Sequence, residues 1–587
     1  MFHFSPRPNR AHEIAWQSWS PDVFTAAKQQ NKPILLAISA VWCHWCHVMD
    51  ETTYSAQPVI EAINRDYLAV RVDNDQRPDI NARYNQGGWP TTAFLTPDGS
   101  LLAGATYLPP EQMENALQQI AQFYAANQAD IEQRTLAMRS TVRAPQPVPD
   151  EELNDTIVRT VLDAVDEQYD EEYGGFGTAP KFPMVDVLEL LEQAHAVTGE
   201  QRYYEMLAHT LLAMSNHGMY DHVEGGFFRY STTRDWTVPH FEKMTEDHAG
   251  LLRVLAHLVR RTRNDAFRST LISALAYVRT TLRDPQTGLF GGSQDADEAY
   301  YALPLEERRT KPVPYVDRNS YTNWTAAMAS AFVLAGFALD DDTALAQGEM
   351  ALDALERLMR DPDGLLYHFY PPGGPAQIRG LLTDQAAYFR ALLDAHEYTG
   401  EPRFLERARA MAKQIQRYFS CEDGSFNDTA AMEQPLGNLQ ISNRPIAENA
   451  LLADSYVRLA QLTSDAAFRD IAERILRAYT GTYARLGLFA AGYARSVQRY
   501  VRQPISVQLV GSRAQIADLL EAAHNLPDAL LSVRTIAPDD AGALQARGFD
   551  PHRSPAAYVC RNQVCAPPAQ SAATLRAAYD NLQLPAG

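Results

Sequence analysis

The sequence predicts a multidomain chain that joins an α/β unit, an all-α toroid of the (α/α)6 kind and a small C-terminal α/β appendage. Apolar alternating runs around a Cys-x-x-Cys motif predict the first unit. Paired amphipathic stretches with alternating short and long connections predict the toroid, and short strand-like and helix-like runs return near the end. We expect domains at 1–143, 154–502 and 503–587, with a Pro-rich acidic linker at 144–153.

Composition excludes two classes of partner. The chain has 587 residues and a formal net charge of −20, so it lacks a broad basic surface for nucleic-acid phosphates or anionic lipid. Its apolar runs, such as 34–38, are far shorter than a bilayer requires. We therefore expect neither a nucleic-acid partner nor a membrane partner.

Cysteine usage indicates the compartment. Five cysteines are too few for a secreted disulfide scaffold, and the first residues lack the basic-then-apolar pattern of a signal peptide. We expect a cytoplasmic protein. Four of the cysteines form close pairs, Cys43 with Cys46 and Cys560 with Cys565, and paired thiols in a reducing compartment suggest redox or metal chemistry.

The first unit is predicted element by element. Ser20-Pro21 opens a helix, and apolar runs at 33–39, 67–73, 92–97 and 101–107 predict strands, with a turn at Asp98-Gly99 and a long helix at 110–140. The motif Cys43-His44-Trp45-Cys46 lies between the first strand and a helix. This order resembles the thioredoxin fold, and Pro90 stands where that family carries its cis-proline.

The position of the motif predicts its chemistry. A cysteine at a helix N-terminus has its thiolate stabilised by free amide N–H groups, so Cys43 is the expected nucleophile and Cys46 the resolving thiol. His44, if protonated, would lower the pKa of Cys43 further. Thioredoxins place a buried acid six positions before the first cysteine, but this chain has Ala37 there, which leaves open how Cys46 handles its proton.

Three other interpretations of the motif were weighed. Cys43 to His47 also matches the c-type haem attachment signature, although attachment usually needs an exported chain. Zinc is a second alternative, but no second Cys or His cluster lies at finger-like spacing. The third is that the cysteines are only packed small residues, which a Cys-x-x-Cys at a strand-to-helix junction argues against. We expect no cofactor and no metal.

The middle region reads as six helical hairpins. Helices are predicted near 151–169, 184–197, 200–217, 244–261, 264–283, 320–337, 342–360, 384–399, 401–419, 446–463, 465–485 and 491–501. Long loops that open with glycine and a bulky residue, at 174, 225, 288, 364, 424 and 487, alternate with short turns. We expect each such glycine at a helix C-cap followed by a tight hairpin, and each following aromatic residue at the mouth of the toroid.

If all long loops lie at one end, they surround one cavity. The candidate acids and bases there are His240, Glu242, Asp247 and Asp297. Aromatic platforms between carboxylates suit carbohydrate, so the candidate substrate-binding residues are Arg229, Tyr230, Trp236, Lys181, Asp384 and Glu448.

Each of these candidates has a structural alternative. Tyr230 and Trp236 could pack the mouth of the barrel, and Asp247 and Asp384 could cap helices. Asp297 could belong to an exposed acidic turn. The segment from His240 to Lys243 could be a charged loop fixed to the rim.

The C-terminal segment is predicted as strand, helix, strand, hairpin and helix. Cys560 and Cys565 could close a hairpin disulfide, bind metal with help from elsewhere, or exchange with Cys43 as a second redox pair. Packing of two small side chains is the remaining alternative.

The pieces together resemble a known family. The stretches that carry the resemblance are WCHWCHVM, RPDINARYNQGGWPTTAFLTPDG, GGFGTAPKFP, GGFFRYSTTRDWTVPHFEKM, SQDADE, TDQA, RPIAENALLADSYVRLA and YVCRNQVC. They are similar to thioredoxin-domain proteins with an attached six-hairpin barrel, a family that includes animal spermatogenesis-associated protein 20. The resemblance implies a thioredoxin-like domain and a toroid of the six-hairpin glycosidase or N-acylglucosamine 2-epimerase type, without an established reaction.

The chain departs from this family inside the barrel. Thr245 to His248 replace the usual tyrosine-aspartate-asparagine, and Pro445 to Asn449 replace the usual proline-serine-glycine-asparagine. The implied sugar chemistry is therefore less secure than the implied fold.

Three functions follow from the sequence. The first is a thiol-disulfide oxidoreductase that acts through Cys43 and Cys46 on a disulfide-bearing protein. The second is a sugar-processing barrel, epimerase, isomerase or glycosidase-like, with a regulatory thioredoxin-like domain. The third is a barrel that binds a glycan or polypeptide without turning it over.

Overall fold

The computed structural model describes residues 2–142, 152–431, 435–502, 505–528, 530–550, 552–561 and 564–583. The predicted linker at 144–153 lies outside these residues except for its last two. The chain forms two compact units. The first contains Met1–Pro147, Gln294–Glu298 and Asp428–Asn443, and the second contains Val148–Ser293, Ala299–Asn427 and Arg444–Gly587. Two short segments from the helical region thus belong to the first unit.

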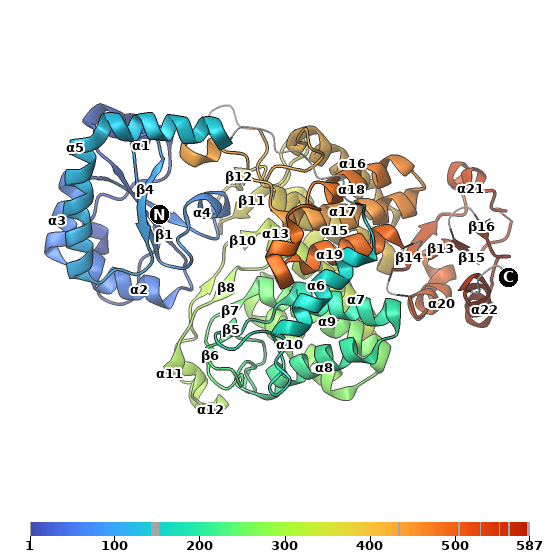
Figure 1. Cartoon of the computed structure of the whole chain (residues 1–587). Coiled ribbons are helices and arrows are strands. Elements are labelled where there is room, and N and C mark those ends of the chain that lie inside the picture. The colour runs from blue at the N-terminus through green and yellow to red at the C-terminus, as the bar shows by residue number, and fades with distance from the viewer. Residues whose placement is uncertain are drawn as a thin grey trace. The chain divides into compact units, whose positions relative to one another are not determined.

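The first unit is built on a four-stranded sheet in the order β2-β1-β3-β4. β1 (Ile34–Ser39) pairs in parallel with β2 (Leu68–Asp73) and antiparallel with β3 (Thr91–Leu95), which pairs antiparallel with β4 (Leu101–Ala105). The helices are α1 (Pro21–Gln30), α2 (His44–Glu51), α3 (Gln57–Asp66), α4 (Pro78–Tyr84) and α5 (Pro110–Val142). This arrangement, of which Figure 1 labels β1, β4 and the five helices, confirms the predicted thioredoxin-like fold.

Two apolar cores, one for each face of this sheet, explain why its central strand is apolar throughout. Leu35, on β1, packs with residues of α3 and α5, whereas Leu36, the next residue, packs with residues of α1 and α4. Successive side chains of a strand point to opposite faces, so a strand covered on both sides must be apolar at every position.

The second unit contains a closed ring of helices. The inner ring is α7 (Val185–Thr198), α9 (Thr245–Thr262), α13 (Thr322–Leu339), α15 (Leu382–Thr399), α17 (Ile446–Thr463) and α19 (Ala491–Val501). The outer helices are α8 (Gln201–Asn216), α10 (Asp265–Tyr277), α14 (Asp342–Leu358), α16 (Pro402–Phe419), α18 (Ala466–Arg477) and α6 (Asp155–Gln168). The first helix, α6, packs against the last, α19, so the ring closes as the predicted (α/α)6 barrel.

The twelve predicted helices are all present, and one of them is shorter than expected. α18 ends at Arg477 instead of 485, where Thr480-Gly481-Thr482 follows. Glycine and β-branched residues disfavour helix, and a 3₁₀ segment, η5 (Tyr483–Ala490), takes over beyond them.

The prediction for the repeated glycines was wrong in one respect. Left-handed C-caps occur at the short turns, for example at Gly199 and Gly400. The glycines of the long loops lie beyond the helix ends, in tight hairpins such as the one closed by Tyr169 and Phe176. A Cβ atom at Gly225, whose φ is +81°, would come within 2.8 Å of the Ser273 carbonyl oxygen, so the close approach of two backbones requires glycine there.

The C-terminal segment repeats the topology of the first unit. β13 (Ile505–Val510) pairs in parallel with β14 (Ser532–Ile536) and antiparallel with β15 (Ala556–Arg561), which pairs antiparallel with β16 (Val564–Cys565). The order β14-β13-β15-β16 matches β2-β1-β3-β4. α20 (Arg513–His524) and α21 (Ala541–Arg547) lie in the connections between strands, and α22 (Ala572–Gln583) follows β16.

The correspondence extends to two details of the backbone. Cis peptide bonds, Trp89-Pro90 and Ser554-Pro555, stand directly before β3 and β15. Cys43 is the N-cap of α2, and Ser512 is the N-cap of α20. The appendage therefore has a thioredoxin-like strand order with a serine where the first unit has its N-terminal cysteine.

One described helix, α13, is long and apolar enough to cross a membrane, with a mean hydropathy of 1.3 over its 18 residues. It is an inner helix of the barrel, and 72% of that stretch is buried. The core helix of a folded domain meets the same criteria.

Candidate functional site

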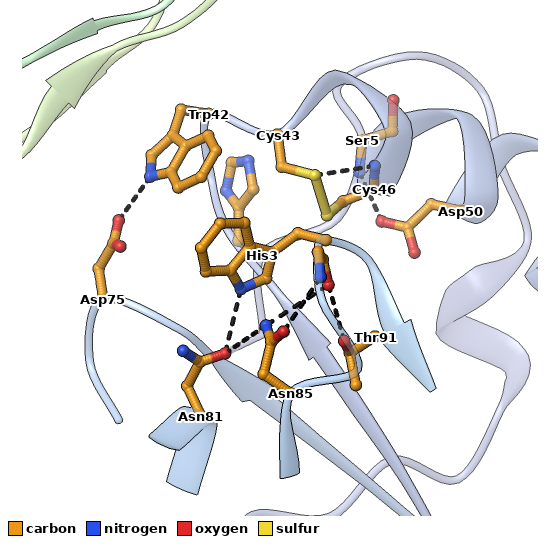
Figure 2. The surroundings of a disulfide bond; sticks show 12 residues. His3, Ser5, Trp42, Cys43, Cys46, Asp50, Asp75, Asn81, Asn85 and Thr91 are labelled. Atoms are coloured by element: carbon orange, nitrogen blue, oxygen red, sulfur yellow. Dashed lines mark hydrogen bonds between the residues drawn. A yellow bond between two sulfur atoms is a disulfide. The ribbon is translucent and has the colours of Figure 1, made fainter. Parts of the chain in front are cut away.

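The redox motif lies where the sequence places it, at the start of α2 (Figure 2). Cys43 and Cys46 form a disulfide with a Cα–Cα distance of 5.2 Å. The Cys46 amide donates a hydrogen bond to Cys43 Sγ at 3.2 Å. A helix N-terminus supplies such donors together with the positive end of the helix dipole, so this contact is the one that would stabilise a Cys43 thiolate.

Polar contacts hold the loop that faces the disulfide. Thr91 Oγ1 donates to the Gly88 carbonyl at 2.7 Å, and Asn85 Oδ1 accepts from the Gly87 amide at the same distance. Trp89 Nε1 donates to Asn81 Oδ1 at 3.2 Å. Figure 2 shows Asn81, Asn85 and Thr91 near the disulfide, so the turn at 87–90, which carries Pro90, is held in place by these residues.

Aromatic rings flank the motif on both sides. Trp42 is buried, donates from Nε1 to Asp75 Oδ2 at 2.7 Å and meets Trp89 edge to face. Trp45 is half exposed and lies 5.2 Å, between ring centroids, from Tyr107. An exposed ring beside a reactive disulfide offers an apolar contact to a polypeptide partner.

The buried acid missing at Ala37 has a counterpart elsewhere in the unit. Ala37 pairs across the sheet with Arg71, and the Arg71 guanidinium binds both carboxylate oxygens of Asp50 at 2.7 and 2.9 Å. Asp50 is on α2, one turn after Cys46. Its carboxylate also accepts from the Ser5 amide, so it is fully engaged and is not a proton acceptor for Cys46.

A second ionisable group, His47, lies near the motif. His47 follows Cys46 directly, and its buried Nε2 has no hydrogen-bond partner among the described residues. Burial and the neighbouring His3 lower the pKa of His47, which keeps the ring neutral and able to accept a proton.

The second cysteine pair also forms a disulfide. Cys560 on β15 lies directly opposite Cys565 on β16, with a Cα–Cα distance of 4.0 Å. Cys560 is buried and Cys565 is exposed. The remaining cysteine, Cys421, is not part of a disulfide and is partly buried.

In the barrel, two of the lysines in the long loops serve as internal clamps. Lys181 Nζ binds Asp170 Oδ2 at 2.6 Å and the Gly174 carbonyl at 2.7 Å. Lys243 Nζ repeats the arrangement on the next loop, with Asp221 Oδ2 and the Gly225 carbonyl, both at 2.8 Å.

The side chains of both lysines and of Trp236 are fully buried. Trp236 Nε1 donates to the Tyr173 carbonyl at 3.0 Å. Lys181 and Trp236 were predicted to bind substrate. Their contacts are with groups of the barrel's own loops.

Three aromatic rings from the first and second long loops form one stack. β5 (Tyr230–Ser231) and β6 (Pro239–His240) place Tyr230 opposite His240, with ring centroids 4.9 Å apart and planes 13° apart. Phe182 stacks on Tyr230 at 4.8 Å and is 39% exposed. His240 Nδ1 contacts the buried carboxylate of Glu242. Phe182 was not predicted, although it belongs to the GGFGTAPKFP stretch.

Asp247 is the third residue of α9, and Met244, not Asp247, is the N-cap. Burial and the neighbouring Glu246 raise the pKa of Asp247 to about 7. A carboxyl group with this pKa exchanges a proton near neutral pH, as a general acid or base must.

A second histidine–carboxylate pair was missed from the sequence. His368, on β11 (Tyr367–Tyr370), lies 2.9 Å from Asp384 Oδ1, and both side chains are buried. Asp384 also accepts from the Asn323 amide and does not cap its own helix. Burial raises the pKa of Asp384. The sequence signal was the histidine in GLLYHF.

Contacts between strands bring these loops to one end of the barrel. β7 (Lys243–Met244), β8 (Ser293–Gln294) and β9 (Val316–Asp317) form one sheet. Tyr321 donates from its hydroxyl to Asp317 at 3.0 Å and lies 5.7 Å from the His368 ring. The second, third and fourth long loops therefore meet there.

The other predicted residues are placed as follows. Arg229 and Glu448 are partly buried, and the Arg229 guanidinium lies 5.9 Å from the Tyr230 ring centroid. Asp297 is exposed and belongs to the first compact unit, whereas His240, Glu242 and Asp247 belong to the second. The described part of the chain contains no group of three or more His, Cys, Asp or Glu side chains suited to a metal ion.

Comparison with known proteins agrees with the two modules. A family model, Thioredox_DsbH, described as a protein of unknown function, DUF255, matches residues 7–143. Human spermatogenesis-associated protein 20 is 25% identical over 96% of this chain and 89% of its own length. The thiol:disulfide interchange protein DsbD of Pseudomonas fluorescens is 32% identical over 13% of each chain.

Among solved structures, cellobiose 2-epimerase from Bacillus thermoamylovorans B4167 is similar at 16% identity and a TM-score of 0.47, over 56% of this chain and 86% of that one. The barrel fold itself follows from the closed ring of helices. The resemblance predicted from the sequence is confirmed: a thioredoxin-like module is fused to an (α/α)6 barrel.

Proposed function

We propose that the first unit is a thiol-disulfide oxidoreductase with Cys43 as nucleophile and Cys46 as resolving thiol. The observation that carries the proposal is the hydrogen bond from the Cys46 amide to Cys43 Sγ at the N-terminus of α2. A thiolate is the attacking species in disulfide exchange, and this environment favours it at the first cysteine.

The reaction balances in two steps. The reduced Cys43 thiolate attacks one sulfur of a partner disulfide, forming a mixed disulfide and releasing the partner's first thiolate. Cys46, after giving up its proton, attacks Cys43 Sγ, forming the Cys43–Cys46 disulfide and releasing the second thiolate. The partner gains two electrons and two protons, and the Cys43–Cys46 pair is oxidised.

A trapping experiment tests this proposal. The Cys46→Ser variant cannot resolve a mixed disulfide, so thiol quenching and mass spectrometry should find Cys43 linked to Cys560, to Cys565 or to a discrete set of other proteins. The Cys43→Ser, Cys46→Ser double variant gives the background. A Cys43 that is free and alkylated in every sample would refute the redox function.

A second candidate function concerns the barrel. The pKa of Asp247, raised to about 7, and the His240–Glu242 and His368–Asp384 pairs together favour acid–base chemistry on a carbohydrate, with the exposed face of Phe182 as a platform. We propose epimerisation or isomerisation of a reducing sugar as the activity to test first.

The test distinguishes an activity of the barrel from the redox activity of the first unit. Product formation from a panel of reducing sugars, followed by NMR, should persist in the Cys43→Ser, Cys46→Ser variant and fall at least 100-fold in Asp247→Asn. Saturable sugar binding that turns nothing over, and that Asp247→Asn leaves unchanged, would favour the non-enzymatic alternative. The cytoplasm remains the proposed compartment, and fractionation of cells tests it.

A further inference from the structure

The barrel contains two adjoining cavities, an outer one at the end opposite its long loops and an inner one that reaches the middle of the ring of inner helices. The inner one holds about 100 Å³ and the outer one about 530 Å³. They share six lining residues: Glu192, His257, Arg261, Glu397, Tyr398 and Leu531. Asp384, beside His368, and Glu397 lie near opposite ends of α15, about 20 Å apart at 1.5 Å per residue. The outer cavity is therefore separate from the loop site described above, whereas the inner cavity reaches Arg390 in the middle of α15, about 9 Å along the helix from Asp384.

The inner cavity has a surplus of positive charge. Its walls carry six arginines and five carboxylates. Three of these guanidiniums converge on one carboxylate, Glu189: Arg253 Nε at 3.2 Å, Arg390 Nη2 at 2.6 Å, and Arg495. One carboxylate cannot balance three cations in a buried site.

Two of those arginines make their ion pair with Glu189, while Asp394 and Asp454 attract Arg390, and Asp186 attracts Arg495, at longer range. Arg253 has a second carboxylate, Asp394, at 2.6 Å, whereas Arg390 and Arg495 contact only Glu189 among the carboxylates of the described residues. Burial lowers the pKa of Arg390 to about 9 and that of Arg495 to about 10, and Arg253 adds repulsion at Arg390.

One buried hydrogen-bond donor in the wall of the inner cavity is also unsatisfied. Arg495 Nε has no acceptor among the described residues, although the residue is only 8% exposed. Buried donors in folded proteins are nearly always paired with protein, water or ligand, so an orphan beside a cavity points to an occupant.

The outer cavity has the size and lining of a small-molecule site. Its volume lies within the range of roughly 300 to 1,000 Å³ typical of such pockets. Leu207, Leu258 and Tyr398 supply apolar surface, and Tyr398 is fixed by stacking on His524 at 4.1 Å. Arg261 stands at the junction with the inner cavity, where its nearest carboxylate is Glu192 at 3.5 Å.

We propose that this pair of cavities binds a small organic molecule that carries one oxyanion group, a carboxylate or a phosphate. The oxyanion binds between Arg390 and Arg495 in the inner cavity, where it supplies the missing negative charge and accepts from Arg495 Nε. The guanidinium fork matches the geometry of either oxyanion. The organic part fills the outer cavity against Tyr398 and Leu258.

Calorimetry on the full chain tests the proposal, with inorganic phosphate and phenyl phosphate as probes and chloride at matched ionic strength as the blank. Both probes should bind saturably, phenyl phosphate at least five-fold more tightly because only it reaches the outer cavity. Arg390→Gln should weaken both by at least ten-fold, whereas Arg268→Gln, an exposed arginine on α10, should leave them unchanged.

Arg390→Gln also separates binding from a structural role. Because it removes surplus buried charge, the variant should melt at the same temperature as the wild type or higher in chloride buffer, and phosphate should no longer raise that temperature. Crystals grown with selenate should show one anomalous peak between Arg390 and Arg495. No saturable heat at 10 mM of either probe, or an Arg390→Gln variant that melts several degrees lower, would overturn the proposal.

Discussion

Asp50 and Arg71 form a buried two-point ion pair, 2.7 and 2.9 Å long, beneath the helix that carries the redox disulfide. Arg71 is the cross-strand neighbour of Ala37, the position where thioredoxins carry their acid. The buried carboxylate of this unit thus lies on α2 instead of on the sheet, and the Arg71 guanidinium binds it there. The pair is a buried ion pair with a structural role, and it stands in place of the proton-transfer acid of thioredoxins.

Asp50→Asn should destabilise the first unit by about 3 to 5 kcal/mol, because it leaves Arg71 buried without a counter-charge. Hydrogen exchange of peptides from 34–73 should report the loss locally. The double variant Asp50→Leu, Arg71→Met removes both charges and should recover most of the stability. If Asp50→Asn exchanged like the wild type, the pair would have no structural role.

The two lysine clamps predict a second stability effect. Lys243→Met should destabilise the second long loop by about 3 kcal/mol, since Asp221 keeps Arg308 at 2.7 Å but the Gly225 carbonyl loses its donor. Hydrogen exchange of peptides from 219–245 measures it. Lys311→Met, at an exposed lysine, is the matched control and should change nothing. Equal exchange in the two variants would contradict the clamp.

Local patterns were enough to predict the twelve helices and the redox motif. Helix periodicity and turn residues are properties of neighbouring positions, and the Cys-x-x-Cys motif lies within one turn of helix. The pairing of Arg71 with Asp50, 21 residues apart, depends on the register of β1 and β2. The pairing of His368 with Asp384 depends on the register of β11. Neither register can be inferred from one sequence.

The charged interior of the barrel was also missed, for a different reason. Glu189, Arg253 and Asp394 lie on inner helices, where a charged position is normally interpreted as a solvent-exposed face. In a closed ring, the axis of the barrel is a second polar surface. Only the closure of α19 on α6 and α7 shows that these charges face one another.

Buried histidine predicts the acid sensitivity of the barrel. The His248 ring donates from Nδ1 to the Met244 carbonyl at 2.6 Å and accepts from the Phe227 amide at Nε2, so it is neutral. Burial lowers the pKa of His248 to about 4. The folded state then binds fewer protons than the unfolded state below pH 6.5, and stability falls as the pH decreases.

Between pH 7 and pH 5 this histidine should cost about 2 kcal/mol of unfolding free energy. Urea unfolding at the two pH values, in wild type and in His248→Gln, measures it as a difference of pH slopes, because other buried histidines titrate in both proteins. His222→Gln, at an exposed histidine, should keep the wild-type slope. An unchanged slope in His248→Gln would show that His248 is not the titrating group.

Asp247 should show the opposite pH dependence. Its pKa is raised to about 7 in the folded protein, so between roughly pH 4 and pH 7 the folded state holds a proton that the unfolded state has lost. Stability is therefore greatest below about pH 4, falls as the pH rises from 4 to 7, and stays low once a desolvated carboxylate has formed beside Glu242 and Glu246. Asp247→Asn mimics the protonated form at every pH.

Asn does not titrate in either the folded or the unfolded state, so the stability of Asp247→Asn relative to the wild type should rise by about 2 kcal/mol between pH 5.5 and pH 8, as measured by urea unfolding. Asp265→Asn, at an exposed aspartate in the first turn of α10, is the control and should show no gain at pH 8. A gain in stability at pH 8 together with loss of sugar turnover would indicate that Asp247 serves catalysis although it lowers the stability of the fold. Equal stability of Asp247→Asn and wild type at both pH values would mean that Asp247 titrates as an ordinary surface carboxyl, which would remove it from the acid–base candidates.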